Sequence, residues 1–125
     1  MKKSKPLLGR KRWFFPDGDL PPRGDSDPHG HESLVILNPN GKDATVRLTI
    51  YFTIRPPVLN VPVIVKGERV LCVRLDEPIG PKKFDIPCGQ YALKLESNVP
   101  IIAQIGRMDV RQANLAYYTV MGFGV

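Results

Sequence analysis

Residues 96–112 read ESNVPIIAQIGRMDVRQ and place an apolar run directly before a dense group of charged side chains. The apolar run over residues 99–105 is typical of a buried strand. After it, Arg107, Asp109 and Arg111 recur at a spacing of two. Because side chains alternate across an extended strand, these three are predicted to point to one side. Such a row forms either a solvated edge or the polar wall of a ligand pocket.

The chain of 125 residues has the length of a single domain, predicted over residues 13–125. Its 13 prolines and 11 glycines imply many turns, which favours strands over helices. Residues 1–12 carry six basic side chains and no acid, so they account for the whole net charge of +6. They are predicted to form a flexible basic tail.

Alternation of apolar and polar residues over 44–54 gives the clearest strand signal. The Asn-Gly pair at residues 40–41 predicts a hairpin over residues 33–54, and Ser97-Asn98 is interpreted as a turn. Strands are expected over residues 13–15, 31–37, 44–54, 61–65, 69–75, 91–96, 99–105 and 115–120. About eight short strands without a long helix predict an all-β, antiparallel β-sandwich of jelly-roll type. A helical turn over residues 111–116 is an alternative for that segment.

The long polar loop over residues 16–30 leads into His29, His31 and Glu32, residue types that bind zinc or iron. A metal site would need a further histidine, and the chain has only these two. We therefore predict no metal and no cofactor, and expect His31 and Glu32 to hydrogen-bond a ligand or to form a polar strand entry at the sheet rim.

Nucleophile, phosphate-loop and dinucleotide motifs are missing from the sequence, so no enzyme is predicted. Cys72 and Cys88 are too few for a disulfide framework and are expected to be reduced, in the cytoplasm. The chain has no apolar run long enough for membrane insertion and no signal peptide is expected. Trp13 is interpreted either as a core residue or as the stacking floor of a pocket.

Several motifs together resemble the soluble sensory rhodopsin transducer family. The segment SNVPIIAQ at 97–104 followed by R-x-D-x-R-Q at 107–112 is the most specific. The other matching segments are HESLVILN at 31–38, TIYF at 49–52 followed by Arg55-Pro56, Arg69, and VRLD at 73–76. The resemblance runs in the same order from about residue 13 to residue 116.

This resemblance implies a β-sandwich of jelly-roll type that assembles as a cytoplasmic homotetramer. It also implies binding of small ligands, in a sugar-related class, and a role in signalling with a membrane photoreceptor or another signalling protein as partner.

Our main hypothesis is a non-enzymatic module for signal transduction and ligand binding. Its predicted ligand-binding residues are Trp13, His31, Glu32, Asn98, Gln104, Arg107, Asp109 and Arg111. An ion-pair network that stabilises the fold or a subunit interface would use the same residues. A second hypothesis is a DNA-associated transcriptional regulator that binds nucleic acid through the basic tail. A third is a metal-dependent enzyme at His29, His31 and Glu32.

Overall fold

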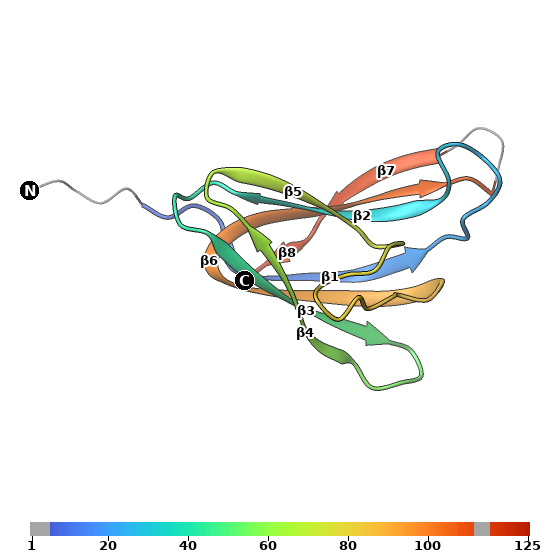
Figure 1. The fold of residues 1–125 in the computed structure, drawn as a ribbon, viewed down its shortest axis with the longest axis horizontal. Coiled ribbons are helices and arrows are strands. Elements are labelled where there is room, and N and C mark those ends of the chain that lie inside the picture. Colours follow the sequence, from blue (N-terminus) through green and yellow to red (C-terminus); the bar gives the residue numbers. More distant parts are fainter. Residues whose placement is uncertain (1–5, 112–115) are drawn as a thin grey trace, which may run out of the picture.

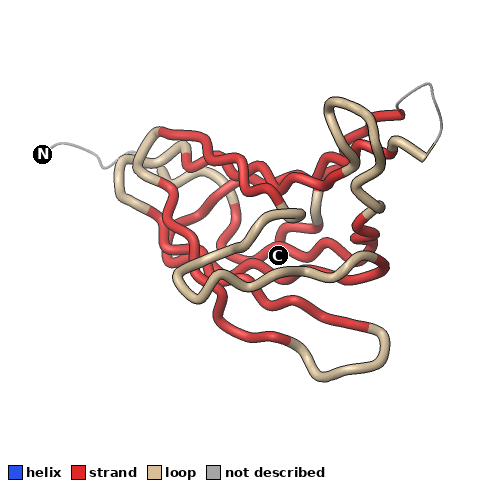
Figure 2. Tube along the Cα trace, turned by 45° about the vertical axis from the view of Figure 1, so that its right-hand side comes forward, coloured by secondary structure: helices blue, strands red, loops and turns tan. Residues whose placement is uncertain are grey.

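The computed structural model describes residues 6–111 and 116–125, which form strands and no helix (Figures 1 and 2). The all-β, antiparallel architecture and the expected strand number are confirmed within this part of the chain. The strands are β1 Arg10–Leu20, β2 His31–Asn38, β3 Ala44–Phe52, β4 Val58–Val65, β5 Arg69–Arg74, β6 Gly89–Asp109, β7 Ala116–Met121 and β8 Phe123–Gly124. The described residues contain no helix that has the length and hydrophobicity needed to cross a membrane.

The strand β6 joins the two layers of the molecule. Residues 89–97 of β6, together with Ile101, pair with β1 and β3, while residues 102–109 pair with β2 and β7. Figure 1 shows β6 running through the lower layer, curving at one end and returning through the upper layer. We call these layer A (β4, β3, β6, β1, β8) and layer B (β5, β2, β6, β7). The prediction that a turn at Ser97-Asn98 separates two strands is therefore wrong. The chain bends there but remains one continuous strand.

Side chains form hydrogen bonds with the backbone at and near this bend. The Trp13 indole Nε1 donates to the Ile101 carbonyl at 3.1 Å, and Asn40 Nδ2 donates to the Pro100 carbonyl at 2.8 Å. Asn98 Oδ1 accepts a hydrogen bond of 2.8 Å from the Thr45 amide. Buried backbone groups need such partners, so the bend is fixed by polar side chains from neighbouring segments.

The core lies between the layers and is lined by the odd-numbered residues of β6 and by the inward residues of β1, β2 and β3. The apolar row of β6 includes Tyr91, Leu93 and Leu95, which are almost fully buried. From layer B, Leu34 and Ile36 of β2 are fully buried in the same cluster. The alternation predicted from the sequence therefore decides which face of each strand enters the core.

The hairpin predicted over residues 33–54 is wrong. β2 pairs with β5 and β6 in layer B, whereas β3 pairs with β4 and β6 in layer A. The connection between them crosses from one layer to the other. It is stabilised by Asn38, whose Nδ2 donates to the carbonyls of Lys42 and Val65 at 2.8 and 3.1 Å.

The first strand also begins earlier than expected, at Arg10, within the segment assigned to the basic tail. Leu8 is held by Asn40 through two hydrogen bonds of 3.0 Å. Gly9 has a φ of 104°, and a Cβ there would lie 2.4 Å from the Ile101 carbonyl oxygen. Only glycine fits this approach, so residues 8–12 are packed on the domain. The alternative helical turn over 111–116 falls mostly outside the described residues.

Candidate functional site

Glu32 is the centre of a buried polar network between the layers. It occupies an inward position of β2, and its side chain is fully buried. Its Oε1 accepts hydrogen bonds from the Tyr91 hydroxyl at 2.8 Å and from the Asp19 amide at 3.0 Å. Its Oε2 accepts a hydrogen bond of 2.9 Å from Arg107 Nε. A buried carboxylate requires such partners, and two strands supply them: β1 through Asp19, and β6 through Tyr91 and Arg107.

Arg107 lies directly opposite Glu32 in the pairing of β2 with β6. Its Nη2 donates to the Asp17 carbonyl at 3.2 Å, and its guanidinium carbon lies 5.2 Å from the centre of the Tyr118 ring. Arg107 therefore contacts β1, β2 and β7 at once. Burial opposes its charge, but the hydrogen bond and the charge of Glu32 outweigh this and raise the pKa of Arg107.

Tyr91 acts as a hydrogen-bond donor in this network. Burial, together with the adjacent Glu32 carboxylate, raises the pKa of the Tyr91 hydroxyl far above its usual range. The hydroxyl therefore keeps its proton and donates to Glu32 at neutral pH. Alternation over residues 91–96 is typical of a half-buried strand that turns Tyr91 inward, but it gives no sign of this polar role.

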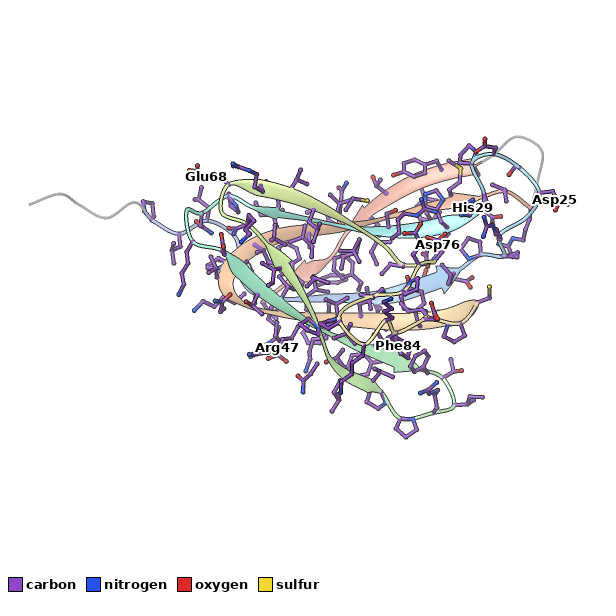
Figure 3. All side chains as sticks on the ribbon, in the orientation of Figure 1. Asp25, His29, Arg47, Glu68, Asp76 and Phe84 are labelled. Atoms are coloured by element: carbon purple, nitrogen blue, oxygen red, sulfur yellow. The ribbon has the colours of Figure 1, made fainter. Side chains whose placement is uncertain are left out.

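A second polar cluster lies beside the first, at the end of β5. Arg74 donates from Nε and Nη2 to the two oxygens of Asp76, both at 2.8 Å, and His29 Nε2 lies 3.1 Å from Asp76 Oδ2. Figure 3 shows His29 and Asp76 at the same end of the molecule. Burial alone would raise the pKa of Asp76, but the hydrogen bonds and charge of Arg74 lower it. The cluster fixes the loop that precedes β2 to the end of β5.

The predicted site residues are not gathered into one hollow. Glu32 and Arg107 are joined directly, whereas His31 is on the opposite face of β2, with its Nδ1 2.8 Å from the His29 carbonyl oxygen. Trp13 and Asn98 hold the bend of β6. The ligand-binding role of these residues remains a prediction.

The remaining predicted residues lie along the second half of β6 and beyond it. Gln104 is on the outer face of layer B, opposite Val35. Asp109 shares the inward face with Arg107, as the spacing predicted, and forms an exposed local pair with Arg111. The hydrogen bonds from Arg111 lower the pKa of Asp109 to about 2.

A cavity of about 240 Å³ lies next to Arg107, between β1, β7 and β8. Asp17 and Tyr118, which both contact Arg107, are in its wall. The full lining is Phe15, Pro16, Asp17, Ile105, Tyr118, Thr119, Val120, Met121 and Phe123. Sequence reasoning missed this cavity because its wall comes from three segments far apart in the chain. The signal that the sequence offered was Tyr118, an aromatic residue in the last expected strand.

The residues considered for a metal site do not converge. Glu32 points into the core toward Arg107, while the ring of His29 faces Asp76. Within residues 6–111 and 116–125, no group of three His, Cys, Asp or Glu side chains is placed to hold a metal ion. The described part of the site therefore offers hydrogen bonding and charge, arranged around a fully buried ion pair.

These features define a class of protein: a small antiparallel β-protein in which one bent strand links two layers and carries a buried arginine–glutamate pair. The sequence profile described as Anabaena sensory rhodopsin transducer (ASRT) matches residues 8–124. The chain belongs to this family, which confirms the resemblance found in its motifs.

Two solved structures are similar along most of the chain. A crystal structure of Thermotoga maritima 1070 has 34% sequence identity and a TM-score of 0.84, and the match covers 95% of this chain and 97% of that one. The Anabaena sensory rhodopsin transducer also has 34% identity, with a TM-score of 0.72 and coverage of 86% of this chain and 96% of the other. No curated protein sequence matches the chain.

Proposed function

We propose that this protein is a cytoplasmic, non-enzymatic signal-transduction module that binds a small, sugar-related ligand in the cavity beside Arg107. Membership of a family named for a sensory rhodopsin transducer supports the signalling role. The exposed free thiols of Cys72 and Cys88 suit a reducing compartment.

The observation that carries the ligand proposal is that Asp17 and Tyr118, which both contact Arg107, lie in the wall of the cavity. The described hydrogen bonds of Arg107, to Glu32 and to the Asp17 carbonyl, use two of the five N–H groups of a guanidinium. The remaining donors suit hydroxyl oxygens of a ligand. Tyr118 offers an aromatic face in the cavity wall, and such faces stack on sugar rings. The cavity wall thus offers an acceptor carboxylate at Asp17 and a stacking surface at Tyr118, and the guanidinium of Arg107 lies next to both residues.

Thermal-shift screening against sugars, sugar phosphates and nucleotides tests this proposal. A ligand at 100 times its Kd should stabilise the fold by about 2.7 kcal/mol and raise Tm by several degrees. Tyr118→Ala should abolish the shift. Tyr117→Ala is the matched control, because Tyr117 pairs with Met108 on the other face of β7. A flat response across the panel, or an equal loss in both variants, would reject the cavity as the site.

We also propose that the protein assembles as a homotetramer. The outer face of layer B exposes Leu37 beside Val70, and Met121 and Tyr117 are exposed on β7. Contiguous exposed apolar side chains mark interaction surfaces. Native mass spectrometry should give four times the chain mass of 14.0 kDa. Val70→Lys combined with Met121→Lys should yield smaller species, and a monomeric wild-type protein would contradict the assembly.

The signalling partner is proposed to be a membrane photoreceptor or another signalling protein, because a similar solved structure is a sensory rhodopsin transducer. Co-sedimentation with proteoliposomes that contain a sensory rhodopsin, with empty liposomes as the control, tests the photoreceptor. Equal recovery in both pellets would argue against it and leave a soluble signalling protein as the partner.

Binding to DNA is a second candidate function, and the arrangement of layer A favours it. On its outer face, Glu96 lies opposite Arg12 of β1 and opposite Arg47 of β3 in the strand register. Lys94 forms an ion pair with the same carboxylate. Three cations thus surround one carboxylate near the start of β1, which has the sequence RKR at residues 10–12. Gel-shift titration should show affinity that falls steeply with salt. Arg12→Gln with Arg47→Gln should weaken it, whereas Lys42→Gln serves as a control for charge alone.

A further inference from the structure

The largest of the described cavities, about 610 Å³, lies at the edge of layer A, away from the Glu32–Arg107 pair. We call it the β4 groove. It is formed by β4 and the segment between β5 and β6 that runs along it. Its lining residues are Val58, Leu59, Asn60, Val61, Pro62, Ile79, Gly80, Pro81, Lys82, Lys83, Phe84 and Asp85. Its volume falls within the range of about 300–1,000 Å³ that is usual for small-molecule sites.

A tight turn forms one wall of the groove. The Ile79 and Phe84 amides each donate to the other residue's carbonyl at 2.9 Å, and the Lys83 amide donates to the Gly80 carbonyl at 3.0 Å. Pro81 occupies the second position of this turn, which its ring favours. The Phe84 ring is held edge-on against Phe52, with centroids 6.5 Å apart. Figure 3 labels Phe84 beside the strands of layer A. The wall is therefore well fixed.

Two of the three non-glycine residues with positive φ in the described chain line this groove. Asn60 and Lys83 have φ values of 58° and 52°, in the left-handed region that L-residues other than glycine rarely adopt. The third such residue in the described chain, Glu68, lies elsewhere. Strained residues of this kind collect at ligand-binding positions. At Lys83 the fold keeps a long cationic side chain where glycine would be conformationally easier.

The charge of the groove indicates what it binds. Lys82 and Lys83 are exposed at its rim, and neither forms an ion pair with a carboxylate in the described part of the chain. Asp85 is the one acidic residue in the lining. The wall between these groups is apolar, with Val61, Pro62 and Phe84 among its members. A flat apolar body with one anionic group matches this distribution.

An added peptide strand fits less well. β4 is an edge strand, but Pro62 has no N–H to donate to an incoming strand. A Cβ on Gly80 would lie 3.4 Å from the Pro62 carbonyl oxygen, so the turn already covers that acceptor. We propose that the β4 groove is a binding site for small organic anions with a flat apolar body, held by Lys82 and Lys83. This site is independent of the proposed function of the Arg107 cavity.

Methyl-detected NMR titration of the full chain with 1-naphthoate tests the proposal. We expect saturable shifts at Val58, Leu59, Val61 and Ile79, and binding of the uncharged 1-naphthamide weaker by about fivefold to tenfold. Lys82→Ala with Lys83→Gly should weaken naphthoate to a similar extent. Because Lys83→Gly relieves a left-handed residue, Tm should not fall. Asp85→Asn should tighten binding, since it removes a repulsive charge.

Lys42→Ala, at an exposed lysine on the β2–β3 connection, should leave binding unchanged. The proposal is overturned if naphthoate and naphthamide bind equally, if the lysine variants bind as tightly as wild type, or if the shifts map to the outer face of layer B. The comparison of the two probes uses wild-type protein, so it decides the matter even if a variant fails to fold.

Discussion

Two arginine–carboxylate pairs lie near the end of β6 and differ in nearly everything except their chemistry. Glu32 and Arg107 join two strands, and their side chains are 0% and 15% exposed. Asp109 and Arg111 are two residues apart in sequence, and their side chains are 26% and 61% exposed. Breaking a buried pair leaves an uncompensated charge, whereas water replaces the partner at the surface. Burial, more than contact geometry, should therefore decide how much each ion pair contributes to stability.

The largest effect should come from removing one partner of the buried pair. Arg107→Met is expected to lower the free energy of unfolding by about 3 kcal/mol, because Glu32 would remain buried without its counter-charge. Urea denaturation measures this loss. The double variant Glu32→Gln with Arg107→Met should recover part of it, since no buried charge remains. If the double variant lost more free energy of unfolding than the two single variants together, the pair would not be stabilised in this way.

The hydroxyl of Tyr91 should have the next largest effect. Tyr91→Phe removes a 2.8 Å hydrogen bond to the buried Glu32 carboxylate while keeping the ring. The expected loss of stability is about 2 kcal/mol, typical of a hydrogen bond to a charged group. Tyr51→Phe provides a control, because Tyr51 is only half-buried. An equal effect of both variants on the urea midpoint would mean that the hydrogen bond from Tyr91 to Glu32 adds no stability of its own.

The Asp76 cluster should give a smaller, pH-dependent effect. Asp76→Asn is expected to cost about 1.5 kcal/mol at neutral pH through lost charged hydrogen bonds from Arg74. The pKa of Asp76 is lowered in the folded protein, so its contribution is complete above about pH 3.9 and disappears as pH falls through the folded value. Wild type and variant should therefore converge in acid. A constant difference in Tm from pH 7 to pH 2 would refute this.

The smallest effect should come from the exposed pair. The pKa of Asp109 is lowered to about 2 by its hydrogen bonds to Arg111. Solvent screens both groups, so Asp109→Asn should leave the urea midpoint within experimental error. A large loss of stability in the monomeric protein would show that this end of β6 is less solvated than its exposure indicates. The contrast between the two pairs would then disappear.

The sequence was most informative where one strand face is buried. Alternation in residues 44–54 predicted β3 well, because a half-buried strand must repeat with period two. The same rule placed Arg107 and Asp109 on one face of β6. It could not show that Ser97-Asn98 bends a continuous strand, because the groups that fix the bend, such as Trp13 and Asn40, come from distant segments.

The sequence predicted several residues of the candidate site, but it did not predict how these residues are arranged. Glu32 and Arg107 are both among the residues predicted for the site. Their direct pairing depends on the register between β2 and β6, which is set by the tertiary fold. Tyr118 and Tyr91 were missed as polar partners because aromatic residues in strands usually fill cores. His31 was grouped with Glu32 by proximity in sequence, although adjacent residues of a strand point to opposite faces.

The central position of β6 has a consequence for synthesis on the ribosome. β1 pairs only with β6 and β8 among the described strands, and β2 and β3 each wait for β6 on one side. Pairs such as β3 with β4 can form early, but β1 and β3 join layer A only after residues 89–97 of β6 have left the exit tunnel, and β2 joins β6 in layer B only after residues 102–108 have followed. A nascent chain stalled before that point would display open strand edges, which favour aggregation. Closure of the two layers is therefore expected to follow the synthesis of β6 and not to proceed strand by strand along the chain.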